Sequence, residues 1–128
     1  MNSDINIVDS SGWLEYIAQT PRARFFSSVI EDTKHLLIPT IVLYEVFKKV
    51  LNDRGEKIAL QVVARMYLAS IVDMNSTIAL SGARASLQYK LPMADSLIYA
   101  TARQYEALLW TQDADMEALP GVRYFKKT

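Results

Sequence analysis

Acidic residues occur where short apolar runs end and where helix-like segments begin. Asp9 directly follows the run INIV, and Asp113 and Asp115 follow the run LLWT. Glu45 lies about one turn into an amphipathic segment, and Asp95 lies in the first turn of a later one. Burying three or four carboxylates together costs several kcal/mol unless cations compensate. A joint site would therefore hold a hard divalent ion, Mg²⁺ or Mn²⁺, which prefers oxygen ligands. Such a site supports phosphodiester hydrolysis.

Each acid also has an ordinary structural interpretation. Asp9 could cap a helix next to Ser10, and Glu45 could pair with Lys48 or Lys49 on a solvated helix face. An acid in a first helical turn is favoured by the helix dipole. Aspartates in a turn commonly hydrogen-bond their own backbone. The hydrolytic interpretation therefore depends on the acids lying together.

Alternating strand-like and helix-like segments must position these acids. We predict strands at residues 5–8, 35–40, 70–75, 108–111 and 122–127. We predict helices from about residue 13, with Ser10 or Ser11 as cap, and at 21–32, 40–54 with Thr40 as cap, 56–69, 76–91 and 93–107.

This alternation predicts an α/β fold, a three-layer α/β/α sandwich around a central, mostly parallel, twisted sheet. The length favours one domain over residues 1–128. Ligands of such open sheets bind beyond the carboxyl ends of the strands. Because Asp9 and Asp113 both follow strands, they are expected at the same edge.

Composition excludes several other chemistries. The chain has no cysteine, which excludes disulfides, thiolate zinc sites and a cysteine nucleophile. His35 is the single histidine, so a nuclease using two imidazoles is impossible. The fourteen basic residues balance the fourteen acidic ones, so nucleic-acid binding needs a local patch. No leader-like or membrane-spanning run is present, and we expect a cytoplasmic protein without membrane contact.

Four motifs occur in the order and approximate spacing of the PIN domain: IVDSSGWLEYI, PTIVLYEVFKKV, LPMADSLIYATA and LLWTQDADME. The chain resembles the VapC-type toxins of type II toxin–antitoxin pairs over nearly its whole length. This resemblance implies a PIN-like fold and an Mg²⁺- or Mn²⁺-dependent endoribonuclease. The alternative is a catalytically silent PIN module that acts as a protein-binding scaffold.

The resemblance assigns roles residue by residue. Asp9 and Asp95 would be the metal ligands, and Glu45 would position or deprotonate the attacking water. The fourth acid matches Asp113, with Asp115 as the reserve. Two hydroxyls would hold the ligand carboxylates in place, those of Ser10 and Thr111.

The resemblance also implies an RNA substrate, a cognate VapB-type antitoxin and a homodimer. Lys48 and Lys49, just beyond Glu45, could contact the RNA backbone, as could Arg84, Lys90 and Arg103. Candidates for base stacking are Trp13, Tyr16 and Tyr44, although core packing is the more frequent role of aromatic residues at helical spacing. Candidates for the dimer surface are Tyr67, Leu68, Ile78, Leu80 and Leu87, with burial in the core of the same chain as the more frequent alternative.

Two other aspartate-dependent families fit less well. A haloacid-dehalogenase-type phosphatase needs a second aspartate two residues after the first, where this chain has Ser11. A receiver domain needs a phosphorylated aspartate at the end of its third strand, and Asp73 in this chain is a poor match.

Overall fold

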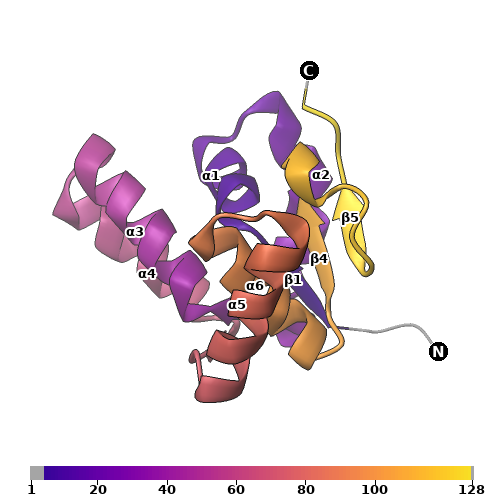
Figure 1. The fold of residues 1–128 in the computed structure, drawn as a ribbon. Helices are drawn as coiled ribbons and strands as arrows, with labels where there is room; N and C mark the ends of the chain where they lie inside the picture. The colour runs from indigo at the N-terminus through magenta and orange to yellow at the C-terminus, as the bar shows by residue number, and fades with distance from the viewer. Residues whose placement is uncertain (1–4, 128) are drawn as a thin grey trace.

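The computed structural model describes residues 5–127 as strands that alternate with helices (Figure 1). The strands are β1 (Asn6–Val8), β2 (Leu36–Pro39), β3 (Ser70–Val72), β4 (Leu108–Thr111) and β5 (Val122–Tyr124). The α-helices are α1 (Ser10–Ala18), α2 (Arg24–Glu31), α3 (Thr40–Arg54), α4 (Glu56–Met66), α5 (Ser76–Tyr89) and α6 (Met93–Gln104). Short 3₁₀ helices are η1 (Pro21–Ala23), η2 (Thr33–His35) and η3 (Ala114–Met116).

The five strands form one sheet in the order β3-β2-β1-β4-β5, and every pair is parallel. The central strand β1 pairs with β2 on one side and with β4 on the other. Its residues Ile7 and Val8 are adjacent in sequence and both fully buried. Since neighbouring side chains of a strand point to opposite faces, the sheet is covered on both sides.

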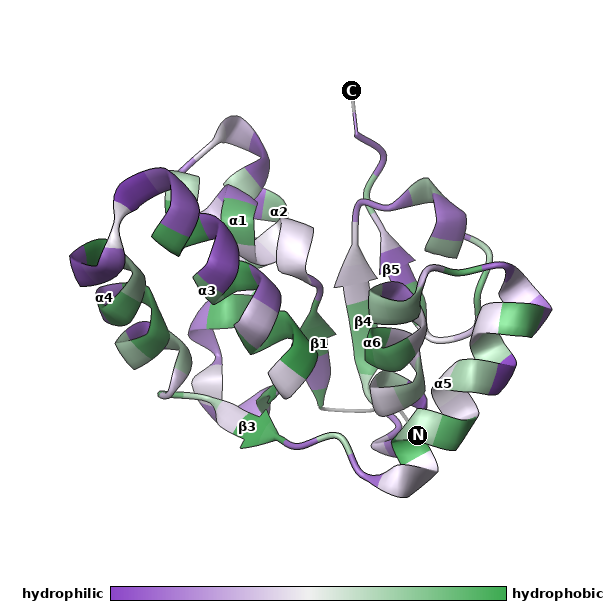
Figure 2. Ribbon diagram, turned by 60° about the vertical axis from the view of Figure 1, so that its left-hand side comes forward, coloured by the Kyte–Doolittle hydropathy of each residue, from purple (hydrophilic) through white to green (hydrophobic). Residues whose placement is uncertain are grey.

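Helices cover the two faces in separate groups, which confirms the predicted three-layer α/β/α architecture. Helices α1 to α4 connect strands in the direction from β1 to β3, and α5 and α6 carry the chain back from β3 to β4. Right-handed crossovers in opposite directions place their helices on opposite faces. Figure 2 shows α5 and α6 on one side of the sheet and the other helices across it, with a hydrophilic connection between α3 and α4.

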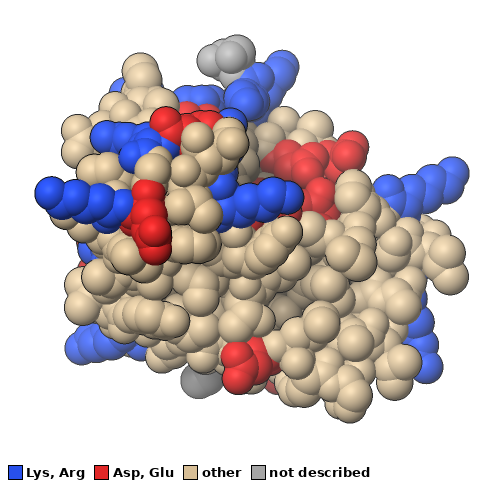
Figure 3. Space-filling view, turned by 90° about the vertical axis from the view of Figure 1, so that its left-hand side faces the viewer, with Lys and Arg blue, Asp and Glu red and all other residues tan. Residues whose placement is uncertain are grey.

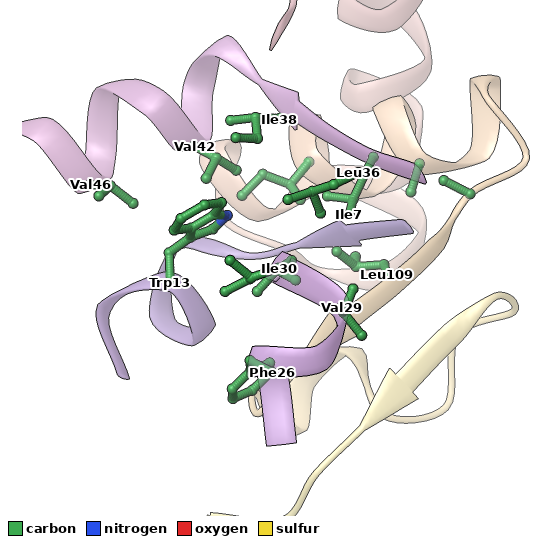
Figure 4. Packing of buried hydrophobic residues seen from close by; sticks show 14 of the residues in the cluster. Ile7, Trp13, Phe26, Val29, Ile30, Leu36, Ile38, Val42, Val46 and Leu109 are labelled. Atoms are coloured by element: carbon green, nitrogen blue, oxygen red, sulfur yellow. The ribbon is translucent and has the colours of Figure 1, made fainter. Parts of the chain in front are cut away.

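The core between the sheet and its first group of helices is aliphatic and aromatic. Trp13 of α1, Phe26 of α2 and Val42 of α3 are fully buried and point toward the strands (Figure 4). Burying a large side chain of this kind stabilises the fold by about 1.5–3 kcal/mol. This packing holds the start of α1 against the end of β1.

The predicted caps of two helices were wrong. Helix α1 begins at Ser10 with Asp9 as its N-cap, so neither Ser10 nor Ser11 is the cap. Helix α3 begins at Thr40, after Pro39 as its N-cap. The carboxylate of Asp9 accepts more donors than a serine hydroxyl can, and Thr40 already has helical geometry.

The remaining boundaries agree with the predictions within a few residues, although several elements are shorter. Helix α4 ends at Met66, and β3 and β5 contain three residues each. None of the helices in residues 5–127 is both long enough and apolar enough to span a membrane.

Candidate active site

The strand order creates a crevice between β1 and β4. The chain builds the sheet outward from β1 through β2 to β3, and then crosses to the other side of β1 to form β4. Parallel open sheets bind ligands at such a reversal, beyond the carboxyl ends of the strands. Asp9 follows β1 and Thr111 ends β4 at this place. The backbone N–H of Asp9 donates to the carbonyl oxygen of Trp110 at 3.1 Å, which fixes the two strand ends together.

Asp9 is a helix cap and a buried carboxylate at the same time. Its side chain is only 4% exposed. Its Oδ1 accepts the Gly12 N–H at 2.9 Å and the Ser11 hydroxyl at 3.0 Å, and its Oδ2 accepts the Thr111 hydroxyl. Burial raises the pKa of Asp9, and these hydrogen bonds oppose that effect by stabilising the charged form. The capping interpretation of Asp9 therefore holds, and the same carboxylate also lines the cavity with the other acids.

Asp95 lies in the first turn of α6 and faces the other acids. Its pKa is raised to about 7, first by burial and then by the charge of Asp113 and a hydrogen bond with it. The charges of Asp9 and Glu45 raise this pKa further. Four carboxylates from β1, α3, α6 and the loop after β4 are therefore close enough to disfavour their joint ionisation.

Glu45 reaches the same place from the second turn of α3. The hydroxyl of Ser10 donates a hydrogen bond to Oε1 of Glu45, so the start of α1 orients this side chain. The alternative pairing with a lysine is not present. Lys49 instead pairs with Asp53 at 3.1 Å, and the ammonium of Lys48 lies 5.6 Å from the ring centre of Tyr44.

The four acids line one open cavity of about 420 Å³. Its walls are formed by Asp9, Ser10, Ser11, Leu14, Glu45, Asp95, Ile98, Gln112, Asp113 and Lys127. Figure 3 shows acidic side chains gathered in a hollow of the surface, with basic side chains around it. The structure thus brings together the four acids that were expected to lie close to one another.

Asp113, and not Asp115, is the acid that lines the cavity after β4. The hydroxyl oxygen of Thr111 accepts the Asp113 N–H at 2.9 Å, and Oδ1 of Asp113 accepts the Asp115 N–H at 2.9 Å. This turn leaves Asp115 exposed. Thr111 therefore contacts Asp9 through its proton and the Asp113 backbone through its oxygen.

Sequence reasoning missed three polar residues of the cavity wall. Ser11 was considered only as a cap, and Gln112 and Lys127 were not singled out. Gln112 is buried, accepts a hydrogen bond from Arg22 and donates to Glu15 at 2.8 Å. A glutamine directly after a strand-ending threonine was a weak available signal. A lysine close to the chain end carried no signal.

Several predicted contact residues lie elsewhere. Trp13 is fully buried, so it has the core role, which was the favoured alternative, and cannot stack on a base. The Tyr16 hydroxyl donates to Glu31 at 3.0 Å on a half-buried ring. Tyr44 is 57% exposed and lines a separate hollow with Glu45 and the two lysines of α3. None of the predicted basic residues lines the acidic cavity, and these are Lys48, Lys49, Arg84, Lys90 and Arg103.

One of the five candidates for the dimer surface lies in the core instead, as the favoured alternative expected. Ile78 is 1% exposed and belongs to the interior. The other four side chains are exposed, and they are Tyr67, Leu68, Leu80 and Leu87.

Known structures share this fold. A chain of a toxin–antitoxin complex from Klebsiella pneumoniae is 21% identical with a TM-score of 0.79, and the match covers 92% of this chain and 95% of that one. A chain of DNA-bound VapBC from Salmonella typhimurium is 21% identical with a TM-score of 0.74, covering 98% of each. VapC20 from Mycobacterium tuberculosis, a toxin that cleaves the sarcin–ricin loop, is 15% identical with a TM-score of 0.74, covering 91% of this chain and 95% of that one.

The comparison with curated proteins gives no match. The comparison with protein families matches residues 7–122 to the PIN domain, which includes β2 to β4, all six α-helices and the acids of the cavity. The chain therefore belongs to the PIN domain family.

Proposed function

We propose that this protein is a divalent-metal-dependent endoribonuclease and the toxin of a VapBC-type toxin–antitoxin pair. The observation that carries this proposal is the meeting of four carboxylates in one cavity at the strand reversal. Acids are expensive to bury together when charged, and a bound divalent cation would compensate their charge. The alternative of a silent scaffold gives these acids no role.

The donor set suits Mg²⁺ or Mn²⁺, because it consists of oxygens only. Within residues 5–127, no three acidic or histidine side chains stand close enough to chelate one ion directly. Mg²⁺ usually keeps several waters and takes only one or two carboxylates. Asp9 and Asp95 would hold the ion, and Glu45 and Asp113 would act through bound water. The bound ion would make hydroxide available near neutral pH and stabilise the leaving oxygen.

The chain's own side chains supply orientation in this scheme. Thr111 and Ser11 hold the carboxylate of Asp9, and Ser10 holds Glu45. Such neighbours lock ligand rotamers and tune their basicity. The raised pKa of Asp95 means that ion binding displaces a proton at neutral pH. Glu45, with no hydrogen bond to the other acids, is placed to accept a proton from water.

A VapB-type antitoxin is the proposed protein partner, since two of the similar structures are complexes of toxins with antitoxins. A homodimer is the proposed assembly, and the cytoplasm is the proposed site of action. RNA is the proposed substrate, with Lys48 and Lys49 as candidates for contact with its backbone.

The test is RNA cleavage by the full chain purified without a partner. A labelled single-stranded RNA pool and a tRNA pool are incubated with Mg²⁺, Mn²⁺ or EDTA, and products are resolved on gels. Asp9→Asn and Asp95→Asn should each lower the cleavage rate at least about 100-fold. Asp73→Asn, which changes an exposed aspartate outside the cavity, is the matched control.

Two results would contradict the proposal. The first is metal-dependent cleavage that persists in Asp9→Asn or Asp95→Asn at the rate of Asp73→Asn. The second is a wild-type chain that cuts none of these RNAs with either ion, which would favour the silent scaffold.

A further inference from the structure

The chain after β5 is fixed to the wall of the acidic cavity. The backbone N–H of Phe125 donates to the carbonyl oxygen of Thr111 at 2.9 Å. The carbonyl oxygen of Phe125 accepts a hydrogen bond from Nη2 of Arg22 at 3.0 Å. Arg22 also donates to Gln112, which lines the cavity. The backbone at residue 125 is thus held by the strand end that orients Asp9.

Aromatic packing fixes the same residue through its side chain. The Phe125 ring stacks on Phe25 at 4.9 Å and on Trp110 at 5.7 Å between ring centres. It meets the buried Phe26 edge-on at 5.8 Å. Aromatic pairs of this geometry contribute about 0.5–1.5 kcal/mol beyond the area that they bury. Phe125 is therefore an anchor, and the residues that follow it start from a fixed position beside the cavity.

Lys127 follows the anchor by two residues, which limits its Cα to about 7 Å from that of Phe125. It is the only cation among the ten residues that line the acidic cavity. Neither of the two ion pairs found within residues 5–127 includes it. Its charge acts on Glu15, an acid outside the four, which already accepts hydrogen bonds from Thr20 and Gln112.

The electrostatics of Glu15 agree with this position. Hydrogen bonds from Thr20 and Gln112 lower the pKa of Glu15, and the positive charges of Lys127 and Arg22 lower it further. Lys127 is therefore an exposed residue of the cavity wall whose charge also reaches Glu15. Lys127 is thus the only positively charged residue that lines the acidic cavity, where the negatively charged RNA backbone would approach the four acids.

We propose that Lys127 binds a phosphate of the RNA backbone next to the scissile one and so positions the strand in the acidic cavity. This inference rests on the proposed function and names a substrate contact for it. A lysine ammonium is a compact charge on a flexible stem, which suits a phosphate at a variable distance. Phosphate contacts position a strand without reading its sequence. Lys127 is thus a general RNA contact and does not determine which base is cut.

The experiment compares Lys127→Gln with Lys126→Gln, since Lys126 is an exposed neighbour that does not line the cavity. Both changes are made in the Asp95→Asn background, so that RNA is not cut. Binding of a fluorescent 12-nucleotide single-stranded RNA of mixed sequence is measured by anisotropy at several salt concentrations with Mg²⁺. Cleavage rates are measured in the background that keeps Asp95. Thermal melting confirms that each variant folds.

Lys127→Gln should weaken RNA binding about 5- to 10-fold and reduce the slope of log affinity against log salt by about 0.7, the value for one phosphate contact on a single strand. Its KM should rise by a similar factor, while kcat stays within about two-fold. Lys127→Arg should retain most of the affinity. Lys126→Gln should leave affinity, slope and KM close to those of the parent.

Equal affinities and equal salt slopes for the two glutamine variants would overturn the inference, whether or not the parent cuts RNA. A change in melting temperature alone in Lys127→Gln would also overturn it, because that result means that the lysine only offsets the charge of the acids. RNA binding that depends on Lys127 in a protein without nuclease activity would support this contact and overturn the proposed function instead.

Discussion

The single hydroxyl of Thr111 makes hydrogen bonds with two of the acidic residues. Its proton goes to the buried carboxylate of Asp9, and its oxygen accepts the Asp113 N–H at 2.9 Å. A carboxylate that is nearly excluded from solvent depends on such donors, because water cannot replace them. Thr111 is itself fully buried. The side chains that hold the acids therefore matter as much as the acids themselves.

Thr111→Val, which keeps the shape of the side chain and removes both hydrogen bonds, should lower the free energy of unfolding by about 1–3 kcal/mol. RNA cleavage should fall at least about 10-fold, because the carboxylate of Asp9 loses a partner that fixes its orientation. Urea unfolding and cleavage rates measure the two effects. The control is Thr101→Val, at a buried threonine whose hydroxyl donates to the Leu97 carbonyl within α6. The prediction is wrong if the two variants cleave RNA equally well.

Asp95 should make the metal-free fold less stable as pH rises. Its folded pKa of about 7 lies above the ordinary value of 3.8, so the folded state keeps a proton that the unfolded state loses between these values. The stabilisation is therefore complete below about pH 4 and is lost as pH rises through 7. Because solvent screens this half-buried group, we expect a loss of about 1–2 kcal/mol between pH 5 and pH 8.

Urea unfolding in EDTA at both pH values measures this loss, and Asp95→Asn should show a smaller one. Added Mg²⁺ should restore stability to the wild type at pH 8, because an ion that binds only the folded state stabilises it. If the free energy of unfolding falls equally in the wild type and in Asp95→Asn between pH 5 and pH 8, a group other than Asp95 binds the proton.

Helix α1 brings the start of its backbone close to β1, and a glycine makes this approach possible. A Cβ added at Gly12 would lie 2.6 Å from Cγ1 of Val8 and 2.9 Å from two ring carbons of Phe26. Both neighbours are fully buried and cannot move aside. The same glycine donates its N–H to Asp9 at 2.9 Å. Packing of this element and geometry of the site therefore depend on one position.

Gly12→Ala should lower the free energy of unfolding by about 1–3 kcal/mol through overpacking, despite the better helix propensity of alanine. It should also reduce RNA cleavage, because α1 and its bond to Asp9 shift together. Gly82→Ala in α5 is the matched control. Among the described residues outside this helix, its Cβ would come closer than 3.5 Å only to the end of the flexible Leu97 side chain, at 2.8 Å. Denaturant unfolding measures the free energy of unfolding of both variants. An equal loss in Gly12→Ala and Gly82→Ala would contradict the close approach of α1 to β1.

At the scale of the whole molecule, helix α5 has an apolar stripe that is exposed to solvent. Leu80 and Leu87 are 65% and 85% exposed, and a spacing of seven residues places them on one face of the helix. Tyr67 and Leu68, which follow α4, are exposed as well. Apolar side chains that share a face in this way suit burial against a second copy of the chain.

We expect the wild-type protein to be a dimer at micromolar concentration, and the double change of Leu80 and Leu87 to Glu to shift it to a monomer. Light scattering during gel filtration measures the mass. Leu60→Glu, at another exposed leucine but on α4, is the control and should leave the dimer intact. A monomeric wild type, or dissociation by Leu60→Glu alone, would contradict this surface.

The order of elements, the parallel α/β architecture and the acids at strand ends and helix starts were predictable from local sequence. Strand and helix patterns depend on a few neighbouring residues, and the rule for parallel sheets places Asp9 and Asp113 at one edge. Glu45 and Asp95 were candidates because they lie near helix starts, and the resemblance to the PIN domain assigned their roles. The cap of α1 by Asp9 is a local contact with Gly12 that the sequence analysis included among its interpretations. Only the tertiary structure decided that Asp113, not Asp115, enters the cavity. It also decided that Trp13 is buried. These outcomes depend on distances between segments remote in sequence, and local patterns contain no information on such distances.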